Sequence, residues 1–157
     1  MKTIILIISL FFSIRNSPTK ISISNHLIQA DTSVYAILKF DTLPGYIFDK
    51  SYKPAELTVF DINKIENLIN EAVKKHNKEA NKYFQIKNPS RYYKQFIAVT
   101  NSKGEKEIWV NCFCEADHFT YWKKSIVSVL DGGTCFFQLK INLTKNTTYD
   151  FGVNGVA

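Results

Sequence analysis

The sequence lacks the local signatures of several common enzyme classes. It has no glycine-rich phosphate loop, no serine-centred nucleophile elbow and no constellation of paired carboxylates. It also has no internal repeat and no low-complexity tract. These absences remove any motif-based support for nucleotide binding or hydrolysis. We therefore expect no catalytic residue and no cofactor, and we predict that the protein is not an enzyme.

Cysteine is scarce, with Cys112, Cys114 and Cys135 as its only instances. Cys112 and Cys114, together with Asp117 and His118, are residue types that bind Zn²⁺. However, Cys-x-Cys on a strand separates the two Cα atoms by about 6.5 Å, and no second pair of finger-type spacing exists. We expect no metal site. In an oxidising compartment Cys135 can pair with Cys112 or with Cys114, and the sequence leaves both pairings open.

Acidic residues are missing from the first thirty positions, which contain Lys2, Arg15 and Lys20. The run Thr3–Ile14 is uncharged and mostly apolar, too short to cross a bilayer of roughly 30 Å but suited to the h-region of a signal peptide. We predict a signal peptide within residues 1–30, cleaved at about 16–30, and a single domain over 31–157. A buried first strand or an uncleaved anchor is the alternative.

This assignment predicts a secreted or periplasmic protein that meets the membrane through its N-terminal segment alone. No cysteine directly follows the apolar run, so a lipid anchor is not expected. Without the segment, 17 basic residues face 14 acidic ones, and the basic excess gives little reason to expect a nucleic-acid partner. The 45% apolar content, with twelve Phe and eight Tyr, predicts a folded core rich in sheet.

One long helix is predicted from about Val59 to Ala80. Thr58 can cap it, with Asp61 three residues later in an arrangement close to a capping box. Apolar residues recur at steps of three and four and form a single stripe. This stripe comprises Val59, Ile62, Ile65, Ile69, Ala72, Val73 and His76, with Leu68 beside it.

Alternating apolar residues predict strands over Ser33–Phe40, Arg91–Thr100 and Glu107–Glu115, and a closing hairpin within Gly132–Ala157. The Ala116–Leu130 connection is predicted to hold a short helix and an extended piece. The expected fold is α+β, with one long helix packed on an antiparallel sheet of four or five strands. A cone-shaped α+β fold of the ketosteroid-isomerase type, with a pocket between helix and sheet, is the alternative.

The alternation also predicts which side chains face the helix. The helix-facing set is Tyr93, Gln95, Ile97, Val99, Cys135, Phe137, Leu139 and Ile141. The outward set contains five aromatic residues that would form a surface for a partner, either an extracellular protein or a glycan. These residues are Tyr92, Phe96, Trp109, Phe113 and Phe136. In the alternative interpretation, the Ala116–Leu130 connection or the N-terminal segment covers them.

The order of strand, helix, two strands, long connection and two strands resembles the cystatin-like fold over roughly Ser33–Ala157. The chain also resembles small secreted α+β proteins of bacteria, mostly of unassigned function, whose last strand ends in a segment like Val153-Asn154-Gly155. The resemblance implies a helix gripped by a curved antiparallel sheet.

True cystatins inhibit papain-like proteases through a Gln-x-Val-x-Gly loop and a Pro-Trp loop. The stretch beginning at Gln95 is similar to the first motif but has Ile97 and Val99 at two of its fixed positions. The last turn, at Lys145–Thr147, contains no Pro-Trp pair. A non-enzymatic binding domain is therefore the leading hypothesis, followed by an enzyme or ligand-binding pocket of the cone fold, and then by a cystatin-type inhibitor.

Overall fold

The computed structural model describes residues 33–42, 44–45 and 47–156. The predicted signal segment lies outside these residues. None of the helices in the described part of the chain has the length and apolarity needed to cross a membrane. The elements are β1 (Tyr35–Ile37), β2 (Lys53–Pro54), α1 (Val59–Glu79), β3 (Tyr93–Thr100), β4 (Lys106–Phe113), β5 (Phe136–Asn142), β6 (Thr147–Val153) and four short 3₁₀ helices, η1 (Phe40–Thr42), η2 (Lys82–Phe84), η3 (Pro89–Arg91) and η4 (Gly133–Cys135).

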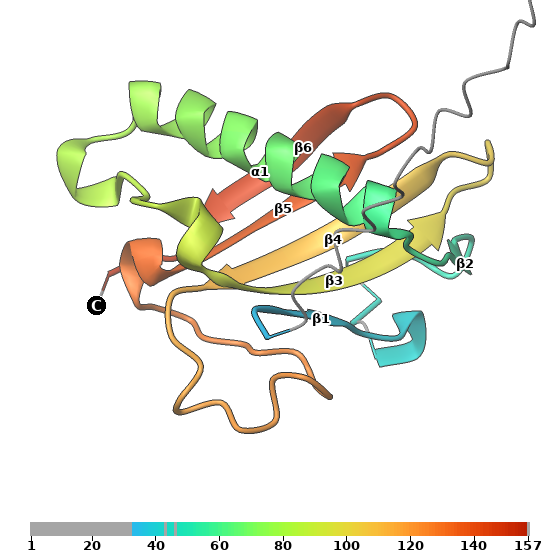
Figure 1. Cartoon of the computed structure of the whole chain (residues 1–157), viewed down its shortest axis with the longest axis horizontal. Coiled ribbons are helices and arrows are strands. Elements are labelled where there is room, and N and C mark those ends of the chain that lie inside the picture. Colours follow the sequence, from blue (N-terminus) through green and yellow to red (C-terminus); the bar gives the residue numbers. More distant parts are fainter. Residues whose placement is uncertain (1–32, 43, 46, 157) are drawn as a thin grey trace, which may run out of the picture.

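Six strands of the described chain form one sheet, and α1 lies across one of its faces (Figure 1). The strand order is β1-β3-β4-β5-β6, and β2 also pairs with β3. The predicted α+β class is confirmed, but the prediction of a purely antiparallel sheet of four or five strands is wrong. Because the chain reverses between β1 and β2, β1 runs parallel to β3 and β2 antiparallel to it.

The helix begins as its sequence predicts. The Asp61 amide donates to Thr58 Oγ1 (3.2 Å), and the Thr58 amide donates to Asp61 Oδ2 (2.9 Å), which completes a capping box. The apolar stripe lies against the sheet and forms the first core with Phe137, Leu139 and Ile141 of β5. Cys135 departs from the prediction, because it precedes β5 and packs against the opposite face.

Strand β3 turns toward α1 the face that was predicted to point away from it. Gln95, Ile97 and Val99 point away from α1, whereas Phe96 and Ala98 belong to the core beneath it. Both faces of β3 are covered, so apolar residues occur at every phase of the alternation and cannot identify the helix side. The same reversal buries Lys94, which is 1% exposed.

The buried Lys94 ammonium is compensated from two sides. Its Nζ donates to the Tyr92 carbonyl oxygen (2.9 Å) and lies 3.3 Å from Glu66 Oε1 of α1. A buried charge needs such partners, because removal from water costs several kcal/mol. The pair therefore fixes the middle of the helix on the sheet, at a position where sequence alone would place a solvent-exposed lysine.

Strand β6 contains a bulge that interrupts the alternation of its side chains. Asp150 and Phe151 together oppose Leu139 of β5, and Asp150 has a φ of 50°. Phe151 keeps to the helix side and stacks on Phe137, with ring centroids 5.7 Å apart. Tyr149 is shifted to the other face, where its hydroxyl donates to Glu107. Regular alternation would place Tyr149 and Phe151 on the same face, and the bulge separates them.

The second face of the sheet is covered by residues 115–131, called the cover segment below, and by the chain after β1 (Figure 1). The cover segment has turns but no helix or strand, so the predicted short helix is wrong. Its side chains form the second core with Trp109 and Phe113 of β4. The main contributors from the segment are Phe119, Trp122, Ile126, Val127 and Val129.

Candidate functional site

The five aromatic residues predicted as a partner surface do not form one. Their exposed fractions run from 0% for Phe96 and Phe113 to 8% for Trp109. Tyr92 and Phe96 lie in the core beneath α1, whereas Trp109, Phe113 and Phe136 lie in the core beneath the cover segment. The protein's own segments therefore cover all five, which cannot support a partner site. The connection covers Trp109, Phe113 and Phe136, as the alternative interpretation expects, whereas α1 covers the other two.

A row of side-chain amides crosses this second face and holds the cover segment. Gln95, Asn111 and Gln138 are neighbours across β3, β4 and β5. Gln95 Oε1 accepts from the Val127 amide (2.9 Å), and Gln95 Nε2 donates to the carbonyl oxygens of Trp122 and Ser125.

The other amides of the row extend the same attachment. Asn111 Nδ2 donates to Gln95 Oε1 (3.0 Å) and to the Val127 carbonyl oxygen (2.8 Å), and Asn154 Nδ2 donates to the Val129 carbonyl oxygen (2.6 Å). A segment without helix or strand needs such partners for its buried backbone groups. The role of these amides is therefore structural, and sequence reasoning missed it because only Gln95 stood out.

The disulfide joins Cys114 to Cys135, with Cα atoms 4.9 Å apart, and this selects one of the two predicted pairings. Cys112 is a buried free cysteine, and its burial raises the pKa of its thiol. Because Cys114 is in the disulfide, it is not available as a thiolate ligand or nucleophile. No group of three or more His, Cys, Asp and Glu side chains is placed to hold a metal ion within the described residues.

Two glutamates of the β3–β4 hairpin meet the same asparagines. Asn101 Nδ2 donates to Glu105 Oε2 (3.0 Å) and to Glu107 Oε1 (2.6 Å), and Asn142 Nδ2 reaches both carboxylates as well. Glu107 is 6% exposed and accepts the Tyr149 hydroxyl. Burial and this hydrogen bond to the carboxylate raise the pKa of Tyr149.

The Glu105 carboxylate is held ionised by its neighbours. A hydrogen bond from Lys145, then those from Asn101 and Asn142, lower the pKa of Glu105 to about 2. A general acid or base for neutral pH needs a pKa near 7 and a free oxygen facing a substrate. The oxygens of Glu105 and Glu107 accept hydrogen bonds from the protein itself, so the cluster is a structural clamp on the two hairpins.

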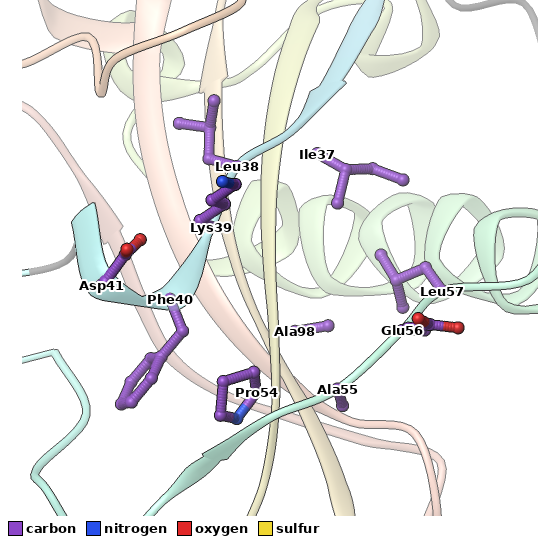
Figure 2. Close-up of a pocket in the computed structure, with 10 residues that line it drawn as sticks. All are labelled: Ile37, Leu38, Lys39, Phe40, Asp41, Pro54, Ala55, Glu56, Leu57 and Ala98. Atoms are coloured by element: carbon purple, nitrogen blue, oxygen red, sulfur yellow. The ribbon is translucent and has the colours of Figure 1, made fainter.

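The candidate site is a pocket at the outer edge of β3, where β1 and β2 diverge (Figure 2). The Leu38 amide donates to the Phe96 carbonyl oxygen (2.9 Å), and the Ala55 amide donates to the Ala98 carbonyl oxygen (3.0 Å). Between these two attachments the flanking chains separate and leave about 530 Å³. The lining residues are Ile37, Leu38, Lys39, Phe40, Asp41, Pro54, Ala55, Glu56, Leu57 and Ala98.

Pro54 ends β2 at a position that a proline can occupy. Since the Ala55 amide points toward β3, the nitrogen of the preceding Pro54 points away from it. A proline is tolerated at such an edge position because no ladder hydrogen bond is lost. Its fixed φ favours an extended chain, which leads through Leu57 to the helix cap at Thr58.

The walls of the pocket are mainly apolar. Figure 2 shows Ile37 and Leu57 on one side and Phe40 and Pro54 on the other, with Ala98 of β3 between them. Ile37 is 50% exposed, although its neighbours in β1 and after it are buried. The arrangement suits a ligand held by apolar contact, because a concave apolar surface releases water when it is filled.

Sequence reasoning missed this pocket. Most of its lining comes from two stretches that are separated in the sequence, the predicted strand Ser33–Phe40 and the stretch Pro54–Leu57, and each contributes to both sides of the pocket. No periodicity links two such stretches across the sheet edge. Ile37 is an ordinary apolar residue of a predicted strand, and its sequence position does not reveal that it is half exposed.

No known protein family matches this chain, and neither does any curated protein or solved structure.

Proposed function

We propose that the protein is a secreted or periplasmic binding domain without catalytic activity, and that the pocket at the edge of β3 takes a small, mainly apolar ligand. One observation carries this proposal: a pocket of about 530 Å³ with apolar walls opens beside a half-exposed isoleucine. Pockets for small molecules generally have volumes of about 300–1,000 Å³ and are predominantly apolar.

The hydrogen bonding of β3 favours a small molecule over a peptide strand. A peptide that extends a sheet needs a free row of backbone groups on an edge strand. Here β1 pairs with residues Lys94–Phe96 and β2 with Val99 and Thr100, and Leu38 and Ala55 add further bonds next to the pocket. The backbone groups of β3 next to the pocket are therefore already paired, whereas a pocket of about 530 Å³ suits a compact ligand.

Two features support export. The predicted signal peptide has a short apolar run, and the Cys114–Cys135 disulfide is compatible with an oxidising compartment. We also propose that the fold is cystatin-like. Two observations support this: α1 lies across the sheet, and β2, which precedes α1, is antiparallel to β3.

The two alternative functions fit the site less well. An enzyme of the cone-shaped fold would need an acid–base pair between helix and sheet. The charged groups that meet there form two ion pairs, Lys94 with Glu66 and Lys106 with Asp61. A cystatin-type inhibitor would need its first motif in an exposed loop. Gln95, where the similar stretch begins, is 0% exposed and bound to the cover segment.

A titration with N-phenyl-1-naphthylamine, an uncharged apolar fluorophore, tests the proposal. We expect saturable binding to the wild-type protein and about tenfold weaker binding to Ile37→Lys, because the substitution places a charge at an apolar wall. Ile37 is already half exposed, so the variant should fold. The matched control is Leu130→Lys, which changes a 96% exposed aliphatic residue outside the pocket.

Equal affinities of the two variants would contradict the assignment of the pocket, and so would linear, non-saturable fluorescence with the wild type. Circular dichroism of each variant establishes that the fold is intact before the affinities are compared.

A further inference from the structure

The net positive charge of the described domain comes from one stretch of the chain. Residues 70–91 contain six basic and two acidic residues, which gives a net charge of +4. The other described residues carry eleven charges of each sign and therefore balance. The stretch comprises the second half of α1 and the short helices η2 and η3, so the positive charge lies at one end of the molecule (Figure 1).

Within this stretch, Lys82, Tyr83, Gln85 and Lys87 surround a hollow of about 420 Å³ that is completed by Tyr92 and Thr134. The Tyr92 hydroxyl donates to the Thr134 carbonyl oxygen (2.8 Å), which closes the floor. Neither lysine forms an ion pair with another described residue, and no acidic side chain lines the hollow. The hollow is therefore electropositive and suited to an anionic group.

A second hollow, of about 510 Å³, adjoins the first and shares Gln85 with it. Its cationic side chains are Lys74 and Lys78 of α1, and Asn70 and Asn88 add amide groups. It too has no acidic residue in its lining. Two neighbouring basic hollows separated by one glutamine side chain can hold two anionic groups of the same ligand.

The backbone that carries these lysines is fixed to the helix. Asn77 Nδ2 donates to the Ile86 carbonyl oxygen (2.8 Å), and the Ile86 amide donates back to Asn77 Oδ1 (2.9 Å). Gln85 Nε2 donates to the Asn77 carbonyl oxygen (3.1 Å). Side chains on a backbone held in this way lose less freedom when a ligand binds, so the hollows are preorganised.

Tyr83 supplies a contact surface beside the charges. It is 86% exposed although it lies between basic residues of a well-anchored segment. An exposed aromatic ring next to lysines and amides can pack against a sugar ring while the polar groups bind hydroxyl and acidic substituents. We propose that Lys74, Lys78, Lys82, Lys87 and Tyr83, called the basic face below, bind an acidic glycan.

The composition of the basic face favours a glycan over other polyanions. Binding of single-stranded nucleic acid uses several exposed aromatic rings along a groove. Two tyrosines line these hollows, but only Tyr83 is exposed, because Tyr92 is 7% exposed. Binding to a membrane surface uses a broad apolar face, whereas lysine and amide side chains dominate here. Amides are suited to sugar hydroxyls because they both donate and accept hydrogen bonds.

Calorimetric titration of the full chain with a heparin hexasaccharide and an oligogalacturonate tests the proposal, with maltohexaose as the neutral control. We expect binding to at least one acidic oligosaccharide and none to maltohexaose. The double variant Lys82→Glu/Lys87→Glu should lose affinity by at least about tenfold, because both charges in one hollow reverse. Lys50→Glu/Lys103→Glu makes the same change in net charge at exposed positions elsewhere and should stay within about twofold of the wild type.

Tyr83→Ala separates stacking from charge. It should weaken binding of the acidic oligosaccharide by about fivefold and leave the salt dependence of that binding unchanged. The proposal is overturned if neither acidic oligosaccharide binds, or if the two double variants lose affinity equally. Tighter binding of single-stranded DNA or of phosphatidylserine vesicles than of both oligosaccharides would also overturn it. None of these outcomes depends on the pocket at the edge of β3.

Discussion

Replacing Gln95 with leucine is expected to lower the free energy of unfolding by about 4 kcal/mol. Gln95 is fully buried, and its amide group bonds the Val127 amide, the Trp122 and Ser125 carbonyl oxygens and the Asn111 side chain. Leucine fills a similar volume but leaves these groups without a partner. Each buried polar group that loses its partner costs about 1–3 kcal/mol, and partial opening of the cover segment to water limits the total.

Chemical denaturation measures the loss, and Gln85→Leu provides the control. Gln85 is half-buried and makes one side-chain hydrogen bond, to the Asn77 carbonyl oxygen, so its replacement should cost about 1 kcal/mol or less. Hydrogen exchange should also show a selective loss of protection at the Val127 amide in Gln95→Leu. A similar small loss in both variants would mean that the cover segment is held mainly by its apolar side chains.

Loss of the Cys114–Cys135 disulfide is expected to cost about 3 kcal/mol. The bond closes a loop with a sequence separation of 21, and the stabilisation of the folded state comes mainly from the reduced freedom of the unfolded chain. The ends of the loop also meet without it, because the Cys114 amide donates to the Cys135 carbonyl oxygen (2.9 Å) and Phe113 pairs with Phe136. Cys114→Ser/Cys135→Ser should therefore keep the fold and unfold at a lower denaturant concentration.

Dithiothreitol gives the internal control for this prediction. It should destabilise the wild-type protein by about the same amount and leave the double variant unchanged, since the buried Cys112 is a free thiol. Peptide mapping under non-reducing conditions should find Cys114 joined to Cys135. A bond between Cys112 and Cys135, or no response of the wild type to reduction, would contradict the pairing.

The helix and most strands were predictable because strong local rules produce them. The capping residues at Thr58 and Asp61 and the apolar stripe of α1 specify the helix without reference to the sheet. Strands β3 and β4 were also identified close to their observed bounds, and β5 and β6 lie within the predicted closing hairpin. Facing was correct for Phe137 and Leu139, because β5 alternates apolar and polar residues along its length.

The prediction of which side chains face the helix was wrong where both sides of a strand are buried. In β3 the wrong residues were placed under the helix, since Lys94 and Gln95 are both buried polar residues with partners far away in sequence. The bulge at Asp150 shifted Tyr149 to the other face by adding one residue to β6. Such features depend on contacts between distant segments, and local periodicity contains no information about them.

The functional site was predicted wrongly for a related reason. An exposed aromatic surface was expected from alternation, but α1 covers two of its residues, Tyr92 and Phe96. The irregular segment 115–131, which is held by its amide partners, covers the other three. The pocket forms because β1 and β2 meet the same edge of β3 in opposite directions. Neither the short pairing of β2 nor the parallel direction of β1 follows from the sequence of either strand.

A two-dimensional ¹H–¹⁵N NMR titration with N-phenyl-1-naphthylamine tests the central claim most directly, because it locates the ligand as well as detecting it. The account predicts that the largest shift changes occur at the amides of Ile37, Leu38, Ala55, Leu57 and Ala98, which surround the pocket on three segments. Shift changes concentrated in the cover segment, or no saturable change at these five amides, would contradict a ligand site at the edge of β3.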